Sequence, residues 1–236
     1  MNFNRIGAYQ DKHVGKNALL LCNGPSLRRT DPSWVKDSGL VTFGLNKIHL
    51  ATELGFPILD YTVAVNKKVI NQLKSDESFK YKKLVLSHRA GLVFPEGEDV
   101  FYINTEPHNL PRFSLDCCVG VHEGWTVTHA ALQLIYYFGI RNVIIVGMDH
   151  NFDSDPTLAN KAETRVGDDH NHFSPSYFAA GQEWDLPDLR NSEISYAEAR
   201  RSYERAGGLI LDATIGGKCK VFLRAEFRDA LELVQR

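Results

Sequence analysis

Three short apolar segments in the first third of the chain, each ending at an asparagine, constrain the fold most strongly. The segments are 18–22, 40–45 and 59–65, and the asparagines are Asn23, Asn46 and Asn66. A short apolar run bounded by turn residues is typical of a buried strand, and the residues after each asparagine suit a helix. Because this alternation continues along all 236 residues, we predict one α/β domain over 1–236, a mostly parallel sheet with helices on both faces.

The first of these turns reads Asn23-Gly24-Pro25-Ser26. Glycine lets the backbone approach a bound group closely, and proline fixes φ where no N–H is needed. Asn23 would stand at the carboxyl end of its strand, where open α/β sheets bind their ligands. Backbone N–H groups there suit a phosphate or a nucleotide. An ordinary strand-to-helix turn is the alternative.

If the three strands are parallel neighbours, their three asparagines gather along one edge of the sheet. An asparagine side chain both donates and accepts hydrogen bonds, which suits a base, a ribose or a phosphate. The alternative is that each asparagine is only the N-cap of the helix that follows it.

The same alternation predicts the remaining elements. Strands are expected at 83–87, 100–103, 142–147, 209–211 and 219–223, of which 142–147 is the most apolar and is predicted to be central. Helices are expected at 47–54, 67–73, 126–138, 191–206 and 225–234. The inner side of the helix 191–206 is predicted to carry Ile194, Ala197, Tyr203 and Ala206. Residues 105–118 lack periodicity and predict a surface loop that borders the site.

Two further positions join the predicted site. Thr126 or Thr128 near a helix start can cap the helix or bind a phosphate there. Asp149 follows the most apolar strand, a common functional position, although it could equally orient a loop.

Residues 152–189 form a long segment rich in Asp, His, Asn, Pro and aromatic residues. Such segments inside a compact domain tend to be lids or binding loops. His170 and His172 stand two residues apart beside Asp168 and Asp169. One imidazole acting as a general base is the economical interpretation. A metal site lacks further ligands at a recognised spacing, so no metal is predicted; exposed loop histidines are the third alternative.

Composition narrows the class of protein. The formal net charge of −2 gives no general attraction to nucleic acid or acidic lipid. The polar segment 1–16 has no signal-peptide core, and no uninterrupted apolar run is long enough to span a membrane. Four cysteines without metal-binding spacing indicate reduced thiols. We therefore predict a cytoplasmic protein, or one peripheral to the inner membrane, without a transmembrane segment.

The turn at Asn23, with Asn46, Asn66, the Gly139–Asp149 strand and a downstream histidine, resembles the nucleotide-sugar half of bacterial family-42 sialyltransferases. The same superfamily includes the flagellin-modifying Maf glycosyltransferases and the MptE-like (6-hydroxymethylpterin diphosphokinase-like) domain. The resemblance spans about residues 17–222. It implies a Rossmann-like fold.

The resemblance implies a metal-independent transferase that takes a CMP-sugar as donor and a glycan as acceptor, in cell-surface polysaccharide or lipopolysaccharide biosynthesis. Together with the predictions above, the nucleotide-binding set is Asn23, Gly24, Pro25, Ser26, Asn46, Asn66, Thr126, Thr128 and Asp149. His172 would be the catalytic base, with His170 as second choice. No bound cofactor is expected, and a homo-oligomer is compatible with the relatives.

Two alternatives remain open at this stage. A diphosphokinase would transfer pyrophosphate from ATP and needs Mg²⁺ held by carboxylates, for which Asp149, Asp153 and Asp155 are available. A catalytically silent nucleotide- or glycan-binding domain would keep Asn23 and Gly24 without needing a poised histidine.

Overall fold

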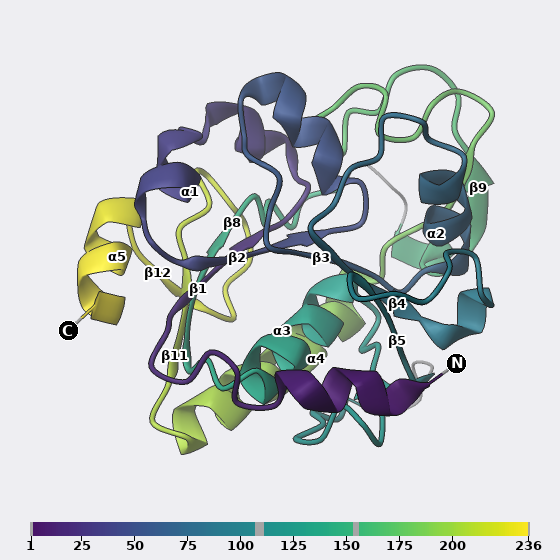
Figure 1. Ribbon diagram of the computed structural model, residues 1–236. Helices are drawn as coiled ribbons and strands as arrows, with labels where there is room; N and C mark the ends of the chain where they lie inside the picture. The colour runs from purple at the N-terminus through teal and green to yellow at the C-terminus, as the bar shows by residue number, and fades with distance from the viewer. Residues whose placement is uncertain (1, 107–110, 153–155, 236) are drawn as a thin grey trace.

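The computed structural model describes residues 2–106, 111–152 and 156–235, and its centre is an eight-stranded sheet (Figure 1). The strands lie in the order β12-β11-β8-β1-β2-β3-β4-β5, and every pairing between them is parallel. The bounds are β1 Ala18–Leu21, β2 Val41–Leu45, β3 Tyr61–Ala64, β4 Lys83–Ser87, β5 Val100–Ile103, β8 Asn142–Val146, β11 Leu209–Asp212 and β12 Leu223–Arg224. The predicted α/β fold with a mostly parallel sheet is confirmed.

The strand order reverses beside β1. The chain builds outward from β1 through β2 and β3 to β5, and then returns to place β8 on the other side of β1. The connections after β1 and β8 therefore leave in opposite directions and open a crevice at the carboxyl ends of these two strands. Strand β8, predicted to be central, lies inside the sheet between β1 and β11.

Helices cover both faces of the sheet, as predicted (Figure 1). One face carries α3 (Val127–Tyr137), α4 (Leu189–Arg205) and the 3-10 helix η1 (Phe3–Tyr9). The other carries α1 (Ser33–Asp37), α2 (Lys67–Lys74), α5 (Phe227–Gln235) and the 3-10 helices η2 (Pro25–Arg29) and η3 (Ile48–Leu54).

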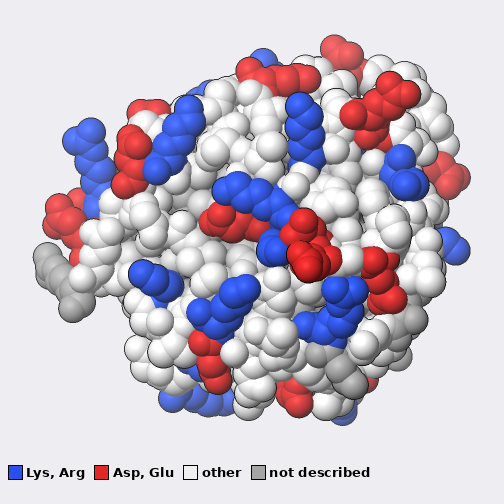
Figure 2. All heavy atoms as spheres, in the orientation of Figure 1, with Lys and Arg blue, Asp and Glu red and all other residues white. Residues whose placement is uncertain are grey.

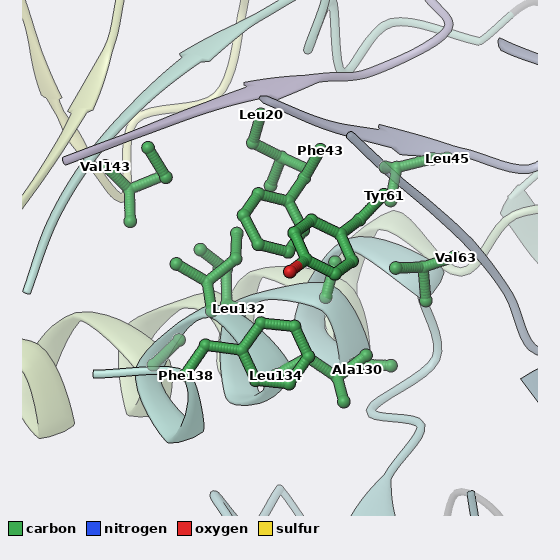
Figure 3. Close-up of a cluster of buried hydrophobic side chains, with 14 of the residues drawn as sticks. Leu20, Phe43, Leu45, Tyr61, Val63, Ala130, Leu132, Leu134, Phe138 and Val143 are labelled. Carbon is green, nitrogen blue, oxygen red and sulfur yellow. The ribbon is translucent and has the colours of Figure 1, made fainter. Parts of the chain in front are cut away.

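Apolar residues fill both sides of the sheet because neighbouring strand residues point to opposite faces. Leu20 packs in the cluster under α3, whereas Leu19 packs in the cluster on the opposite face. Beneath the sheet, the rings of Phe43 and Tyr61 stack with centroids 4.7 Å apart and meet Phe138, the C-cap of α3 (Figure 3). Burying each such side chain contributes about 2 kcal/mol. The strand ends are thus fixed on a well-packed support.

The predicted inner side of the helix 191–206 is wrong in part. Tyr203 is fully buried, but Ile194 is 46% exposed. The buried side of α4 consists of Ser192, Ser195, Tyr196, Ala199, Ser202 and Tyr203. Small residues on this side allow α4 to approach α3, which is itself buried on nearly every side. Apolar spacing alone could not reveal that close packing decides the face.

Two predicted elements differ in kind. Residues 219–223 do not form a strand over their whole length: only Leu223–Arg224 pairs with β11, because Cys219 and Phe222 turn inward into the core. The expected helix at 47–54 is the 3-10 helix η3, in which the Thr52 hydroxyl donates to the carbonyl of His49.

The two segments predicted as loops contain short structure. The first includes β6 (Thr105–Glu106), which pairs with β7 (Val121–His122). The second contains η5 (Pro156–Leu158) and a hairpin of β9 (Ala162–Thr164) and β10 (Glu183–Asp185). We call residues 156–186 the hairpin segment. A further 3-10 turn, η4, covers His88–Ala90. Within the described ranges, no helix combines the length and apolar character needed to cross a membrane.

Candidate functional site

A cavity of about 440 Å³ lies at the carboxyl ends of β1, β2, β3 and β8. This is the crevice beside β1 that the strand order creates, and its size is that of a small-ligand pocket. The predicted site residues that line it are Asn23, Gly24, Asn46, Asn66, Thr126, Thr128, Asp149 and His172. Pro25, Ser26 and His170 are not among the lining residues. The structure therefore brings most of the predicted set together.

Asn23 offers an acceptor rather than a donor to the cavity. Its Nδ2 donates to the carbonyl of Leu45 at 3.0 Å, which fixes the amide orientation. Its Oδ1 is buried without a hydrogen-bond partner, and leaving such an oxygen unpaired costs about 1–3 kcal/mol. A hydroxyl or amine of a ligand would satisfy it, whereas a phosphate oxygen would be repelled. The geometry thus favours a ribose or base contact at Asn23.

The other two asparagines differ from each other. Asn46 adopts φ 50° and likewise has a buried Oδ1 without a partner. Asn66 is the N-cap of α2: its Oδ1 accepts the N–H groups of Lys68 and Val69, and its Nδ2 donates to Asp185 at 2.7 Å. The helix-cap interpretation therefore holds for Asn66, while Asn23 and Asn46 each present an unsatisfied oxygen.

Asp149 organises the turn after β1. Its carboxylate accepts the Ser26 hydroxyl at 2.6 Å and the Ser26 N–H at 3.1 Å. A Cβ on Gly24 would lie 2.0 Å from Asp149 Oδ2, so only glycine fits beside this carboxylate. The loop-orienting alternative for Asp149 accounts for these contacts.

The N-terminus of α3 faces the same cavity. Thr126 is its N-cap, with Oγ1 accepting the Thr128 N–H at 3.3 Å, and Thr126, Val127 and Thr128 all line the cavity. The first turn of a helix carries partial positive charge and N–H groups directed outward. This end of α3 is therefore the part of the cavity best suited to an anion. We refer to Asn23, Asn46 and the α3 N-terminus as the strand-end cradle.

His172 comes to the cavity from the hairpin segment. Its Nδ1 lies 2.8 Å from Asp169 Oδ2, and its ring stacks on Tyr177 with centroids 4.0 Å apart and planes 3° apart. Burial raises the pKa of Asp169, but the hydrogen bond and charge of His172 outweigh it and hold that pKa below its usual value. With Nδ1 donating to Asp169, Nε2 is the nitrogen that can accept a proton. His170 is exposed and outside the cavity.

Aromatic residues from the predicted lid segment 152–189 surround His172. The ring centroids of Phe152, Phe178 and Trp184 lie 5.3–6.2 Å from that of the imidazole. Trp184 also contacts the other two rings, at 6.4 Å from Phe152 and 5.5 Å from Phe178. The indole Nε1 of Trp184 is buried without a partner, so it too can serve a ligand. Tyr177, Phe178 and Trp184 belong to the aromatic-rich segment 152–189, but no local pattern in the sequence assigned a role to any of them.

Backbone strain concentrates around the cavity. Among the described residues, Asp11, Asn46, Trp125, His150 and Asn160 are the non-glycine residues with positive φ. All of them except Asp11 line the cavity. Residues held in this sparsely populated region cluster at functional sites. The backbone strain therefore indicates that the cavity is a functional site, and this evidence does not depend on the sequence predictions.

Acidic side chains are present among the described residues that line the cavity. Of the described residues that line it, none is lysine or arginine, whereas Glu123, Asp149 and Asp185 are present. Glu123 pairs with Arg89 at 3.0 Å and Asp185 with Lys68 at 2.7 Å. No group of three or more metal-binding side chains occurs in the described part of the chain. On the face of the molecule that Figure 2 shows, acidic and basic residues are interspersed without a continuous patch of either sign.

Comparison with solved structures finds a similar fold in a glycosyltransferase. A Maf glycosyltransferase from Magnetospirillum magneticum AMB-1 superposes with a TM-score of 0.56 at 14% identity, over 99% of this chain. The two proteins share a fold. This chain spans only 41% of that protein's length. The predicted relation to the Maf proteins is confirmed at the level of the fold.

Other comparisons add little. The sialyltransferase CstII from Campylobacter jejuni, solved with the substrate analogue CMP-3FNeuAc, covers 89% of this chain and 86% of its own at 8% identity, but its TM-score of 0.48 supports no conclusion. No family model matches the chain, and no curated protein matches its sequence. The resemblance to the MptE-like domain stays a prediction.

Proposed function

We propose that the protein is a glycosyltransferase that uses a nucleoside monophosphate-linked sugar, with a CMP-sugar as the favoured donor. The observation that carries the proposal is the meeting of the strand-end cradle and an Asp-supported imidazole around one cavity. The fold shared with a Maf glycosyltransferase is consistent with it. The proposal includes a glycan acceptor, a role in cell-surface polysaccharide or lipopolysaccharide assembly, and a cytoplasmic or peripheral inner-membrane location.

The charge of the cavity supports a monophosphate over a diphosphate. The N-terminus of α3 faces the cavity with hydroxyl groups beside it, and the first turns of α2 and α4 also contribute lining residues. All three N-termini carry side-chain caps. The caps of α2 and α4 bring a carboxylate, through Asp185 bonded to Asn66 and through Asp188 itself, whereas the cap of α3 is the neutral hydroxyl of Thr126. With no lysine, arginine or metal-binding cluster among the described lining residues, the donors available suit a single phosphate group better than the larger charge of a diphosphate.

The chemistry follows from these positions. The acceptor hydroxyl loses its proton to Nε2 of His172 as its oxygen bonds to the anomeric carbon of the donor sugar. The bond from that carbon to the phosphate oxygen breaks, and the electron pair leaves with CMP. Asp169 stabilises the imidazolium that forms, because its carboxylate already accepts from Nδ1. The N-terminus of α3 stabilises the departing phosphate.

A ligand panel tests the proposal. Calorimetric titration with CMP, CDP, UDP, GDP and ATP, each with and without Mg²⁺, should give tightest binding to CMP that does not depend on Mg²⁺. Binding of ATP alone, and only with Mg²⁺, would instead establish the diphosphokinase alternative. That alternative gains no support from Asp149, which is engaged by Ser26; Asp153 and Asp155 lie outside the described residues. CMP binding without any transfer would favour the silent binding domain.

A further inference from the structure

Lys47 is a lysine buried where the sheet meets the hairpin segment. It directly follows Asn46 at the end of β2 and is only 5% exposed. Burying an ammonium group is unfavourable unless its hydrogen bonds are satisfied. An apolar residue would fill the same space without this cost. The contacts of the amine therefore need an explanation beyond filling space.

The amine joins two points of the hairpin segment. Lys47 Nζ donates to the carbonyl of Tyr177 at 2.6 Å and to Oε1 of Gln182 at 3.0 Å. It also lies 4.8 Å from the ring centroid of Phe178, within the range of a cation–π interaction. The backbone N–H of Lys47 donates to the Tyr177 hydroxyl at 3.4 Å. Tyr177 is thus held by Lys47 at both its main chain and its phenol.

Tyr177 in turn supports His172. The imidazole lies flat on the Tyr177 ring, with centroids 4.0 Å apart, and the Asp169 carboxylate fixes its edge. The N–H of Phe173 donates to the carbonyl of Asn23 at 2.9 Å, so the next residue is also attached to the sheet. The position of the imidazole over the cavity depends on these contacts, and the cationic one is Lys47.

We propose that Lys47 is a positioning residue, whose ammonium group sets the place of the candidate base His172 by holding Tyr177 and Gln182 against the end of β2. This inference rests on the proposed function for the role of His172. Lys47 itself is not among the residues that line the cavity, so it acts through Tyr177.

The test replaces the amine with an apolar group of similar length. In Lys47→Met, the ring protons of His172 should lose the upfield NMR shift that stacking on Tyr177 imposes, and amides of 169–182 should exchange at least tenfold faster. The affinity for CMP should stay within about threefold of the wild-type value, while the turnover rate (kcat) falls at least tenfold. Lys47→Arg, which keeps the charge and two donors, should restore much of the shift.

Two further variants keep the test decisive. Lys68→Met is the matched control, because Lys68 also contacts the hairpin segment, through Asp185, but does not touch Tyr177; its His172 signals should match those of the wild type. Gln182→Met removes one acceptor and should reproduce part of the Lys47→Met effect if Lys47→Met does not fold. Unchanged His172 signals and exchange rates in a folded Lys47→Met would overturn the inference. Failure of the wild type to bind CMP, with the His172 shift lost in Lys47→Met, would instead overturn the proposed function alone.

Discussion

The strand-end cradle and the hairpin segment contribute to one cavity in different ways. The cradle is built on parallel strands and a helix N-terminus, so its residues are placed by backbone hydrogen bonds and core packing. The hairpin segment pairs through its backbone mainly with itself. It is attached to the sheet and to α2 largely by side chains, among them Lys47, Lys68 and its own buried aromatic residues. A ligand-binding surface can therefore be rigid on one side and depend on individual contacts on the other.

The largest effect is expected at the hairpin segment. Replacing His172 with glutamine should lower turnover by about 10²–10⁴-fold, the usual contribution of a general base, while CMP affinity changes by less than about threefold. Turnover is measured as CMP release from a CMP-linked sugar in the presence of a glycan acceptor. If His172→Gln lost affinity and turnover equally, His172 would contribute to binding rather than to catalysis, and the division between a binding cradle and a catalytic hairpin segment would be wrong.

The charge on Lys47 predicts an unusual dependence of stability on pH. Burial lowers the pKa of Lys47 to about 8, against the opposing charges of Asp76 and Asp169. Between pH 8 and about 10.5 the unfolded chain then binds more protons than the folded chain, so this group makes stability rise with pH. The difference in the free energy of unfolding between the wild type and Lys47→Met should shift by about 3 kcal/mol in favour of the wild type across this window.

Measuring that difference by urea unfolding at several pH values cancels the contributions of cysteines and tyrosines common to both proteins. His49 lies near Lys47 and carries its own lowered pKa, but it titrates well below this window. A difference that stays constant from pH 8 to 10.5 would show that burial does not lower the pKa of the Lys47 amine.

In the turn next to the strand-end cradle, the close packing of Gly24 predicts a smaller loss. Gly24→Ala places a Cβ against Asp149 and the Gly147 carbonyl, so the turn must shift, at a cost of about 1–3 kcal/mol in the free energy of unfolding. CMP binding should weaken because Asn23 moves with the turn. Gly97→Ala is the control, since a Cβ there meets nothing within 4 Å. Equal stability of the two variants, measured by chemical denaturation, would contradict the close packing described.

The smallest effect separates two asparagines that look alike in the sequence. Asn66→Ala should lower stability by about 1 kcal/mol, because it removes an N-cap, and should change CMP affinity little. Asn23→Ala should weaken CMP binding and abolish discrimination between CMP and its 2′- and 3′-deoxy forms. Calorimetry on both variants measures this, and a reversed pattern would show that the cap and the ligand contact were assigned to the wrong residues.

The sequence predicted the cradle better than the hairpin segment for a physical reason. A buried strand followed by Asn23 or Asn46 is a local pattern, and parallel strands bring their ends together. Lys47 and Tyr177 are far apart in the chain, and no local pattern indicates that one contacts the other. The outward orientation of Ile194 was likewise hidden, because it depends on close packing between two helices.

Amide NMR mapping during a CMP titration shows which residues contact the nucleotide. We predict saturable shifts at the side-chain amides of Asn23 and Asn46 and at the backbone of Thr126 and Thr128, with smaller shifts near His172. Absence of binding, or shifts confined to residues away from the carboxyl ends of β1, β2 and β8, would contradict this prediction.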